Sequence, residues 1–142
     1  MSTKQTGDLS EISFVAWCLE KGLGVALPFG DRHPYDVIVD VGGRLIKVQV
    51  KTGWYRYSGV LAVAVTNTTT ENGKWVYQNY IGRADRIVAR DPETKIMYVF
   101  RPDDLGEDAR EIHFRLRPTK NKQKVGVRFA VDYELTSVDQ LL

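Results

Sequence analysis

The chain has 142 residues, 43% hydrophobic and 27% charged, so we expect one ordinary soluble domain spanning residues 1–142 with its own buried core. Its single cysteine excludes an internal disulfide, and one cysteine with two histidines cannot build a zinc site. No apolar run is long enough to cross a membrane, and residues 1–8 lack the apolar stretch of a secretory signal. We therefore expect an intracellular protein of the cytoplasm or nucleoid, with no membrane partner.

The net charge is only +2, but the basic residues are unevenly distributed along the chain. Residues 110–128 contain seven Lys and Arg against one acid, and residues 44–56 contain four and no acid. Basic segments of this kind attract phosphate backbones. The alternative is a solvated basic loop, and composition alone leaves both interpretations open.

The predicted elements begin with a helix over residues 9–21, where apolar residues recur at helical spacing behind a cap at Asp8 or Ser10. Residues 25–29 then predict a short strand, closed by a turn at residues 30–34. Two strand-like runs, Tyr35 to Val41 and Arg44 to Lys51, follow on either side of Gly42-Gly43. This pattern predicts a tight hairpin.

Residues 59–66 are nearly all apolar and predict a central strand, whereas residues 66–73 (TNTTTENG) are most typical of a loop. Residues 85–90 and 95–100 predict two strands around a turn. A C-terminal hairpin is expected from residues 111–133, with the basic loop of residues 118–124 at its tip. The expected fold is therefore α/β (α+β), with a mixed β-sheet flanked by helices and an early helix packed on it.

The Gly42-Gly43 hairpin has a register that brings polar residues together. If Val41 pairs with Arg44, Asp36 lies directly across from Gln49, and Lys51 shares the face of Gln49. Directly opposed Cβ atoms lie roughly 4.5–5.5 Å apart, so the three side chains converge on one patch. The alternative is an amphipathic hairpin whose polar face simply meets water.

This patch suits the hydrolysis of a phosphodiester. The reaction needs a divalent cation near the phosphate and a positive charge that stabilises the transition state. The Asp36 carboxylate, the Gln49 side-chain oxygen and the Val50 carbonyl are oxygen ligands of the kind that Mg²⁺ takes. Lys51 can orient or deprotonate the attacking water, or stabilise the pentavalent phosphate.

Asp36, separated by twelve residues from Gln49-Val50-Lys51, resembles the signature of the PD-(D/E)XK nuclease superfamily. The surrounding segments are similar to the small group I intron-associated (homing-type) endonucleases, with Holliday-junction resolvases as near relatives. This similarity covers nearly the whole chain and is carried by residues 4–11 (KQTGDLSE), 27–36 (LPFGDRHPYD), 48–53 (VQVKTG), 80–82 (YIG), Asp85, 92–94 (PET) and 121–133.

The resemblance implies a restriction-endonuclease-like core and Mg²⁺-dependent hydrolysis of DNA, with Mn²⁺ as a possible substitute. Carried over by position, Glu11 is the acid of the first helix and Asp36 the central metal ligand. Gln49 occupies the (D/E) position and Lys51 is the lysine. The expected catalytic residues are therefore Glu11, Asp36, Gln49 and Lys51, and the expected metal ligands are Glu11, Asp36, Gln49 and Val50.

The sequence departs from the family pattern at two positions. Tyr35 stands where the family has proline, although Pro34 is adjacent, and Gln49 replaces an acid. A neutral amide binds a cation less strongly than a carboxylate, so the number of metal ions stays open. Glu11 also has an alternative role, because Asp8-x-x-Glu11 fits a capping box at a helix start.

Two segments are candidates for binding DNA. Arg56 and Tyr57 follow Lys51 within an aromatic run that suits stacking and phosphate contact, and equally suits packing on the core. The other segment is the polar tip of the expected C-terminal hairpin, whose side chains suit adenine edges and phosphates. Its candidate residues are Lys120, Asn121, Lys122, Gln123 and Lys124. Trp75, Tyr77 and Tyr80 are expected to pack.

Three functions follow from this sequence. The first is a site-specific, homing-type endonuclease, and the second is a resolvase of branched DNA. The third is a DNA-binding module that kept the fold but lost activity, for which Gln49 is the best support. An enzyme that cuts both strands of DNA with one active site per chain is expected to act as a symmetric oligomer, here a homodimer or homotetramer.

Overall fold

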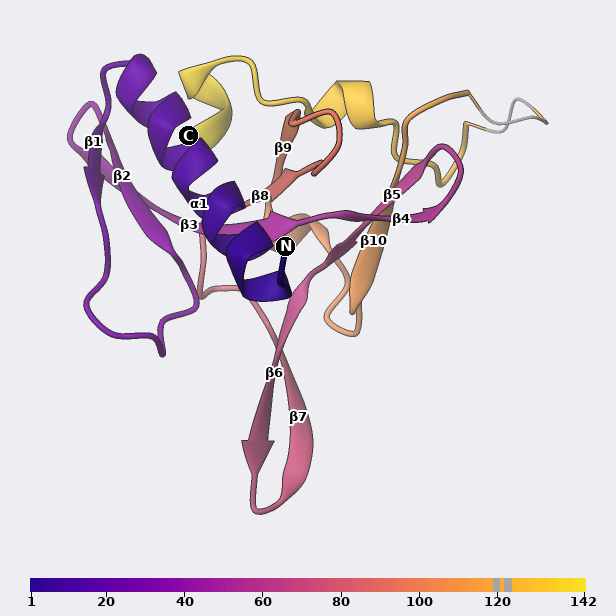
Figure 1. Ribbon diagram of the computed structural model, residues 1–142, viewed down its shortest axis with the longest axis horizontal. Helices are drawn as coiled ribbons and strands as arrows, with labels where there is room; N and C mark the ends of the chain where they lie inside the picture. Colours follow the sequence, from indigo (N-terminus) through magenta and orange to yellow (C-terminus); the bar gives the residue numbers. More distant parts are fainter. Residues whose placement is uncertain (119–120, 122–123) are drawn as a thin grey trace.

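The structure, a computed structural model, describes residues 1–118, 121 and 124–142. One long helix, α1 (Thr3–Glu20), crosses a five-stranded mixed sheet (Figure 1). The strand order in this sheet is β1-β2-β3-β8-β9, in which β3 and β8 are parallel and the other neighbours antiparallel. The strands are β1 (Gly24–Ala26), β2 (Val37–Val41), β3 (Arg44–Thr52), β8 (Arg86–Arg90) and β9 (Met97–Phe100).

A second sheet has the order β10-β5-β4, and two further strands, β6 and β7, form a hairpin of their own. The bounds are β4 (Trp54–Tyr57), β5 (Val60–Ala64), β6 (Thr66–Glu71), β7 (Lys74–Asn79) and β10 (Glu111–Arg115). The described residues also include the short 3-10 helices η1 (Pro102–Asp104), η2 (Ala130–Tyr133) and η3 (Val138–Leu141). In the part of the chain that the structure describes, no helix is both long and apolar enough to span a membrane.

The five-stranded sheet separates two hydrophobic clusters, because successive side chains of a strand point to opposite faces. Val88 and Val99 pack with Phe14 of α1 on one face. Ile87 and Phe100, their neighbours along β8 and β9, pack with the second sheet on the other. Every residue of β8 is buried, as expected for a strand covered on both faces. The expected α+β architecture with a mixed sheet is confirmed.

Helix α1 begins earlier than the sequence predicted. Ser2 is its N-cap, and Ser2 and Gln5 form the capping box: the Gln5 N–H donates to Ser2 Oγ at 3.2 Å, and the Ser2 N–H donates to Gln5 Oε1 at 2.8 Å. The cap expected at Asp8 or Ser10 was wrong. Glu11 therefore lies inside the helix, and its alternative role in a capping box is excluded.

The predicted Gly42-Gly43 hairpin and its register are confirmed. Val41 pairs with Arg44 and Val37 with Val48, and both turn glycines have positive φ. If the pairing is extended by one residue beyond the Val37–Val48 pair, Asp36 lies opposite Gln49. The strand expected at residues 25–29 is shorter, because β1 ends at Ala26 and residues 27–36 form a loop without regular secondary structure.

Residues 66–73 were predicted as a loop, and this was wrong. They form β6 and the turn into β7, paired from Thr66–Asn79 to Glu71–Lys74. The β-branched threonines suit a strand. Asn72 (φ 50°) and Gly73 (φ 75°) both adopt positive φ, as a two-residue hairpin turn requires.

The prediction of a C-terminal hairpin was also wrong. β10 pairs with β5 instead, and residues 125–133 form no strand. Their only described bridge to β10 is Arg115–Phe129, which is parallel rather than antiparallel. The chain turns at Gly126 (φ 73°) and continues into η2, whose Ala130 joins the core.

Two glycine-to-alanine substitutions should change stability in opposite directions. Gly53 follows β3, and a Cβ there would lie 2.8 Å from Leu61 Cδ1 and 3.2 Å from the Ala62 carbonyl oxygen. Gly53→Ala should therefore lower the free energy of unfolding by about 1–3 kcal/mol. Gly7 lies inside α1 with nothing within 4 Å, so Gly7→Ala should raise it by about 0.5–1 kcal/mol. Chemical denaturation measures both, and equal effects would contradict the packing around Gly53.

Candidate active site

Asp36 lies one residue before β2, and its backbone and carboxylate both bind β3. Its N–H donates to the Val48 carbonyl at 2.9 Å. The Val50 N–H in turn donates to Asp36 Oδ2 at 2.9 Å. This bond fixes the carboxylate and leaves Oδ1 available for another ligand. The half-buried Asp36 side chain is thus held at the open end of the hairpin, as the register predicted.

Gln49 and Val50 lie beside this carboxylate on β3. The Gln49 Nε2 amide donates to the Val50 carbonyl oxygen at 3.3 Å, so two of the expected neutral ligands are in contact. A cation at this carbonyl would replace the amide N–H, and the Gln49 carboxamide would have to turn its oxygen toward the cation. The structure therefore groups Asp36, Gln49 and Val50 within one hairpin.

Lys51 is the next residue of β3 after Val50, and its ammonium lies over an aromatic ring. Its Nζ is 5.1 Å from the ring centroid of Tyr80, which is 3% exposed and belongs to the core. Burial lowers the pKa of Lys51, and the charge of Asp36 opposes this shift. Burial and the charge of Asp36 raise the pKa of Tyr80 to about 12. Lys51, Tyr80 and Asp36 are therefore close electrostatic neighbours.

Glu11 reaches the site from α1. It lines a pocket of about 280 Å³ together with Asp36, and the loop of residues 27–36 forms the rest of the wall. The neighbouring residue in α1, Ser10, is 1% exposed, and its Oγ lies 2.6 Å from Thr52 Oγ1, next to Lys51 in β3. This hydroxyl pair joins α1 to β3 next to Glu11 and Lys51.

The two carboxylates repel each other. Burial, followed by the charges of Asp36 and Asp8, raises the pKa of Glu11 above its ordinary value. Burial also raises the pKa of Asp36, although its bond from the Val50 N–H and the charge of Lys51 oppose the shift. A divalent cation between the carboxylates would relieve both effects.

The donor set fits magnesium. Two carboxylates, a backbone carbonyl and an amide oxygen are the hard oxygen ligands that Mg²⁺ prefers. Among the described residues, no three His, Cys, Asp or Glu side chains are grouped closely enough to hold a metal ion. A cation bound by Glu11 and Asp36 would take its further protein ligands from neutral oxygens, such as those of Gln49 and Val50.

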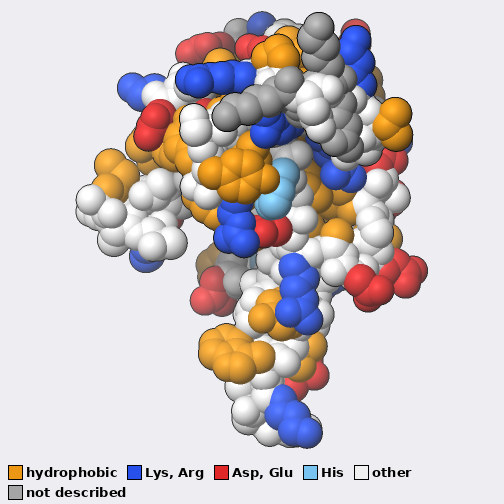
Figure 2. Space-filling model, turned by 90° about the vertical axis from the view of Figure 1, so that its right-hand side faces the viewer, with side chains coloured by type: hydrophobic (Ala, Val, Ile, Leu, Met, Phe, Trp, Pro, Cys, Tyr) orange, Lys and Arg blue, Asp and Glu red, His pale blue; other side chains and the backbone are white. Residues whose placement is uncertain are grey.

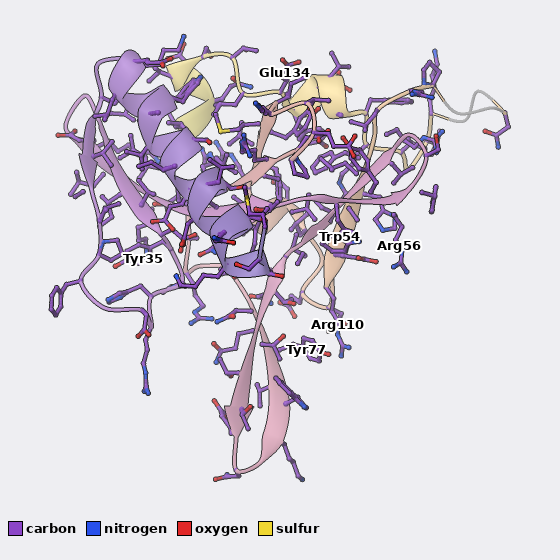
Figure 3. The ribbon with its side chains drawn as sticks, in the orientation of Figure 1. Tyr35, Trp54, Arg56, Tyr77, Arg110 and Glu134 are labelled. Carbon is purple, nitrogen blue, oxygen red and sulfur yellow. The ribbon has the colours of Figure 1, made fainter. Side chains whose placement is uncertain are left out.

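The residues predicted to bind DNA that the structure describes do not line this pocket. Arg56 is exposed on β4, with Nε 3.9 Å from Glu111 Oε1, and Tyr57 is 59% exposed. Arg56 and Tyr35, which lines the pocket, lie on opposite sides of α1 (Figure 3). Of the expected loop, Lys120, Lys122 and Gln123 lie outside the described residues, whereas Asn121 and Lys124 are described.

Sequence reasoning missed several functional candidates. Tyr80 was expected only to pack, but its ring also contacts the Lys51 ammonium. Asp31 and His33 line the same pocket as Glu11, although neither was named as a site residue from the sequence. Two packing predictions were wrong, because Trp75 is 74% and Tyr77 49% exposed. The threonines of β6 could have predicted this exposure, because a strand so rich in polar residues indicates an exposed hairpin, on which Trp75 and Tyr77 lie.

Tyr80 should act as a positioning residue for Lys51. Tyr80→Phe keeps the ring, so kcat for DNA cleavage should stay within about twofold. Tyr80→Leu removes a cation–π contact worth about 0.5–2 kcal/mol and should lower kcat by roughly 2–30-fold with little change in KM. The control is Tyr98→Leu, in the same core, which should destabilise the protein but leave kcat unchanged. Equal kcat losses in both leucine variants would contradict this role.

The mixed sheet crossed by α1 is the core of a restriction-endonuclease-like fold. A model of the PD-(D/E)XK endonuclease family matches residues 1–136, and the chain belongs to this family.

Among solved structures, the chain is similar to a bacterial homing endonuclease, I-Ssp6803I, with 34% sequence identity and a TM-score of 0.77. The match covers 94% of this chain and 89% of that one. None of the curated proteins matches significantly. The expected relationship to PD-(D/E)XK nucleases and to homing-type endonucleases is confirmed.

Proposed function

We propose that this protein is a Mg²⁺-dependent, site-specific endonuclease of the homing type that hydrolyses phosphodiester bonds of DNA. The observation that carries the proposal is the convergence of Glu11, Asp36 and Lys51 beside the Gln49 and Val50 oxygens. The similarity to I-Ssp6803I, described as a homing endonuclease, supports the homing type.

The chain's own residues supply binding and charge. Glu11, Asp36, Gln49 and Val50 would hold the cation, which when bound would polarise the phosphate and make water more acidic. Lys51 faces the same site and brings a positive charge to the phosphate oxygens, where negative charge grows in the transition state. Because Lys51 is desolvated, it gives up a proton more readily than an exposed lysine and can also take part in activating water.

DNA binding needs a surface larger than the pocket. We infer that the exposed Arg56 and Tyr57 contact the duplex away from the cut, together with the basic segment Lys120, Asn121, Lys122, Gln123 and Lys124. Cutting both strands with one active site per chain requires two copies, so we propose a homodimer or homotetramer as the active form. Such an enzyme would act on intracellular DNA.

One experiment separates this function from its alternatives. The protein is incubated with linear duplex DNA or a four-way junction, with and without Mg²⁺, and with Mn²⁺ as a second metal. Cleavage of one site in long linear DNA, only with metal, supports the proposal. Preferred cleavage of the junction would indicate a resolvase. Binding of DNA without cleavage under any condition would indicate a weakened module, for which Gln49 would be the reason.

A further inference from the structure

The β6–β7 hairpin projects from the body beside the candidate active site (Figure 1). Its strands pair with each other and with neither of the two larger sheets. A two-stranded ribbon is only marginally stable in water without a partner. The loop of residues 27–36 projects in the same direction, so that this loop and the β6–β7 hairpin both extend below α1 in the view of Figure 1.

The two faces of this ribbon differ in chemistry. One face carries two amides, from the cross-strand pair Asn67 and Gln78, followed by Thr69 opposite Val76. The other carries aromatic rings, Tyr77 opposite Thr68 and Trp75 opposite Thr70. The Arg110 guanidinium lies 3.8 Å above the Tyr77 ring on that second face, where blue and orange side chains follow the hairpin in Figure 2.

The amide face lines a groove that continues into the active site. This groove, of about 490 Å³, runs between the ribbon and residues 31–34 and includes Asn67, Thr69 and Gln78. Asp31 and His33 line both this groove and the pocket of Glu11 and Asp36. A polymer with one segment at the pocket would therefore extend along the amide face.

We propose that the β6–β7 hairpin is the base-reading arm of this enzyme: it enters the major groove of duplex DNA, and Asn67 and Gln78 read base edges next to the cut. This inference rests on the proposed function and adds where specificity is determined. The major groove is wide enough for a two-stranded β-ribbon, and Asn and Gln side chains pair with adenine.

The side chains of this face are prepared for such contacts. Arg83 Nη1 donates to Gln78 Oε1 at 3.0 Å and thereby fixes the direction of the carboxamide. Within the described part of the chain, neither the Gln78 amide nitrogen nor the Asn67 carboxamide makes a hydrogen bond, so both are available to a base. Lys74, at the tip, can reach a phosphate.

The test is a binding selection from randomised duplex DNA. All proteins carry Asp36→Asn so that no duplex is cut, and the double variant Asn67→Ala/Gln78→Ala is compared with the unaltered hairpin. The double variant should lose about tenfold in preference at each position read, while its affinity for unselected DNA stays within about threefold. Thr68→Ala, in the same strand but on the aromatic face, is the matched control and should keep the full preference.

The outcomes distinguish this inference from the endonuclease itself. An unchanged preference in the double variant would overturn the base-reading arm, and a change in oligomeric state alone would assign the hairpin to a subunit contact. Cleavage by the wild-type protein is measured in parallel. If the wild-type protein does not cleave but the sequence preference still depends on the hairpin, only the endonuclease function is refuted. If the protein binds no duplex, both proposals are refuted.

A tethered probe gives a second, independent measurement. Cys18 is fully buried and burial raises its pKa to about 12, so a cysteine introduced at Asn67 would be the only reactive thiol. An iron chelate attached to Asn67→Cys should cleave selected duplexes within a few base pairs of the enzyme's own cut. The same chelate at Lys21→Cys, beyond the far end of α1, should not. Equal cleavage from both positions would contradict the placement.

Discussion

Asp36→Asn is expected to lower Mg²⁺-dependent cleavage by at least about a thousandfold, or roughly 4 kcal/mol of transition-state stabilisation. Asparagine keeps an oxygen that can accept the Val50 N–H bond, so the hairpin geometry should survive. What is lost is the negative charge that holds a cation. Single-turnover cleavage of a selected target measures the effect.

The same substitution should make the metal-free protein more stable. The pKa of Asp36 is raised in the folded state, so the folded protein binds more protons than the unfolded chain above the ordinary pKa of 3.8. Stability therefore falls as pH rises from 3.8 through the folded pKa, and at neutral pH the ionised carboxylate is unfavourable. Asp36→Asn removes this cost, and Tm without metal should rise.

Asp40→Asn is the matched control, because Asp40 lies in the adjoining strand β2 and accepts the Gly43 N–H at 2.8 Å. It should leave both cleavage and Tm nearly unchanged. Adding Mg²⁺ should raise Tm of the wild type and of Asp40→Asn, and not that of Asp36→Asn. Wild-type cleavage by Asp36→Asn, or an equal Mg²⁺ shift in all three proteins, would remove Asp36 from the metal site.

Lys51→Met should lower cleavage by about 10²–10⁴-fold, because it removes the positive charge that we propose stabilises the phosphate while keeping a side chain of similar length. Binding of DNA should weaken only a few-fold, since one ammonium contributes little to a whole interface. Cleavage and filter-binding assays on the same duplex separate the two effects.

Lys47→Met is the matched control for Lys51. Lys47 lies four residues earlier in β3 and also faces a tyrosine ring, with Nζ 5.8 Å from the centroid of Tyr35. Lys47 itself does not line the pocket of Glu11 and Asp36, so cleavage by Lys47→Met should fall by less than threefold. If both methionine variants lose activity equally, the lysine at position 51 has no special role.

The β2–β3 hairpin and its register could be predicted from the sequence because they depend on residues close together in the chain. Gly42-Gly43 determines the turn, the turn determines the register, and the register brings Asp36 opposite Gln49. Glu11 could be placed only through the family resemblance. Its contact with the site depends on how α1 packs across β3, and no spacing within a helix reports that packing.

The errors arose where distant partners decide the structure. The threonines of residues 66–70 are polar, as in a loop, and β-branched, as in a strand. They form a strand here because the Asn72-Gly73 turn pairs them with residues 75–79. The apolar residues after position 124 are typical of a strand, but β10 pairs with β5 and not with this segment. Lys51 over Tyr80 joins residues far apart in the chain, so this contact required the tertiary fold.

The hydroxyl pair between Ser10 and Thr52 has a consequence for the order in which the molecule assembles. Asp36, Gln49 and Val50 meet by closing a short stretch of chain, so their arrangement is complete once that hairpin exists. Glu11 joins these residues only when α1 packs on β3. Partial detachment of α1 would therefore remove Glu11 from the pocket, and with it the activity, without unfolding the β-sheet. Amide hydrogen exchange should therefore find the helix opening before β3.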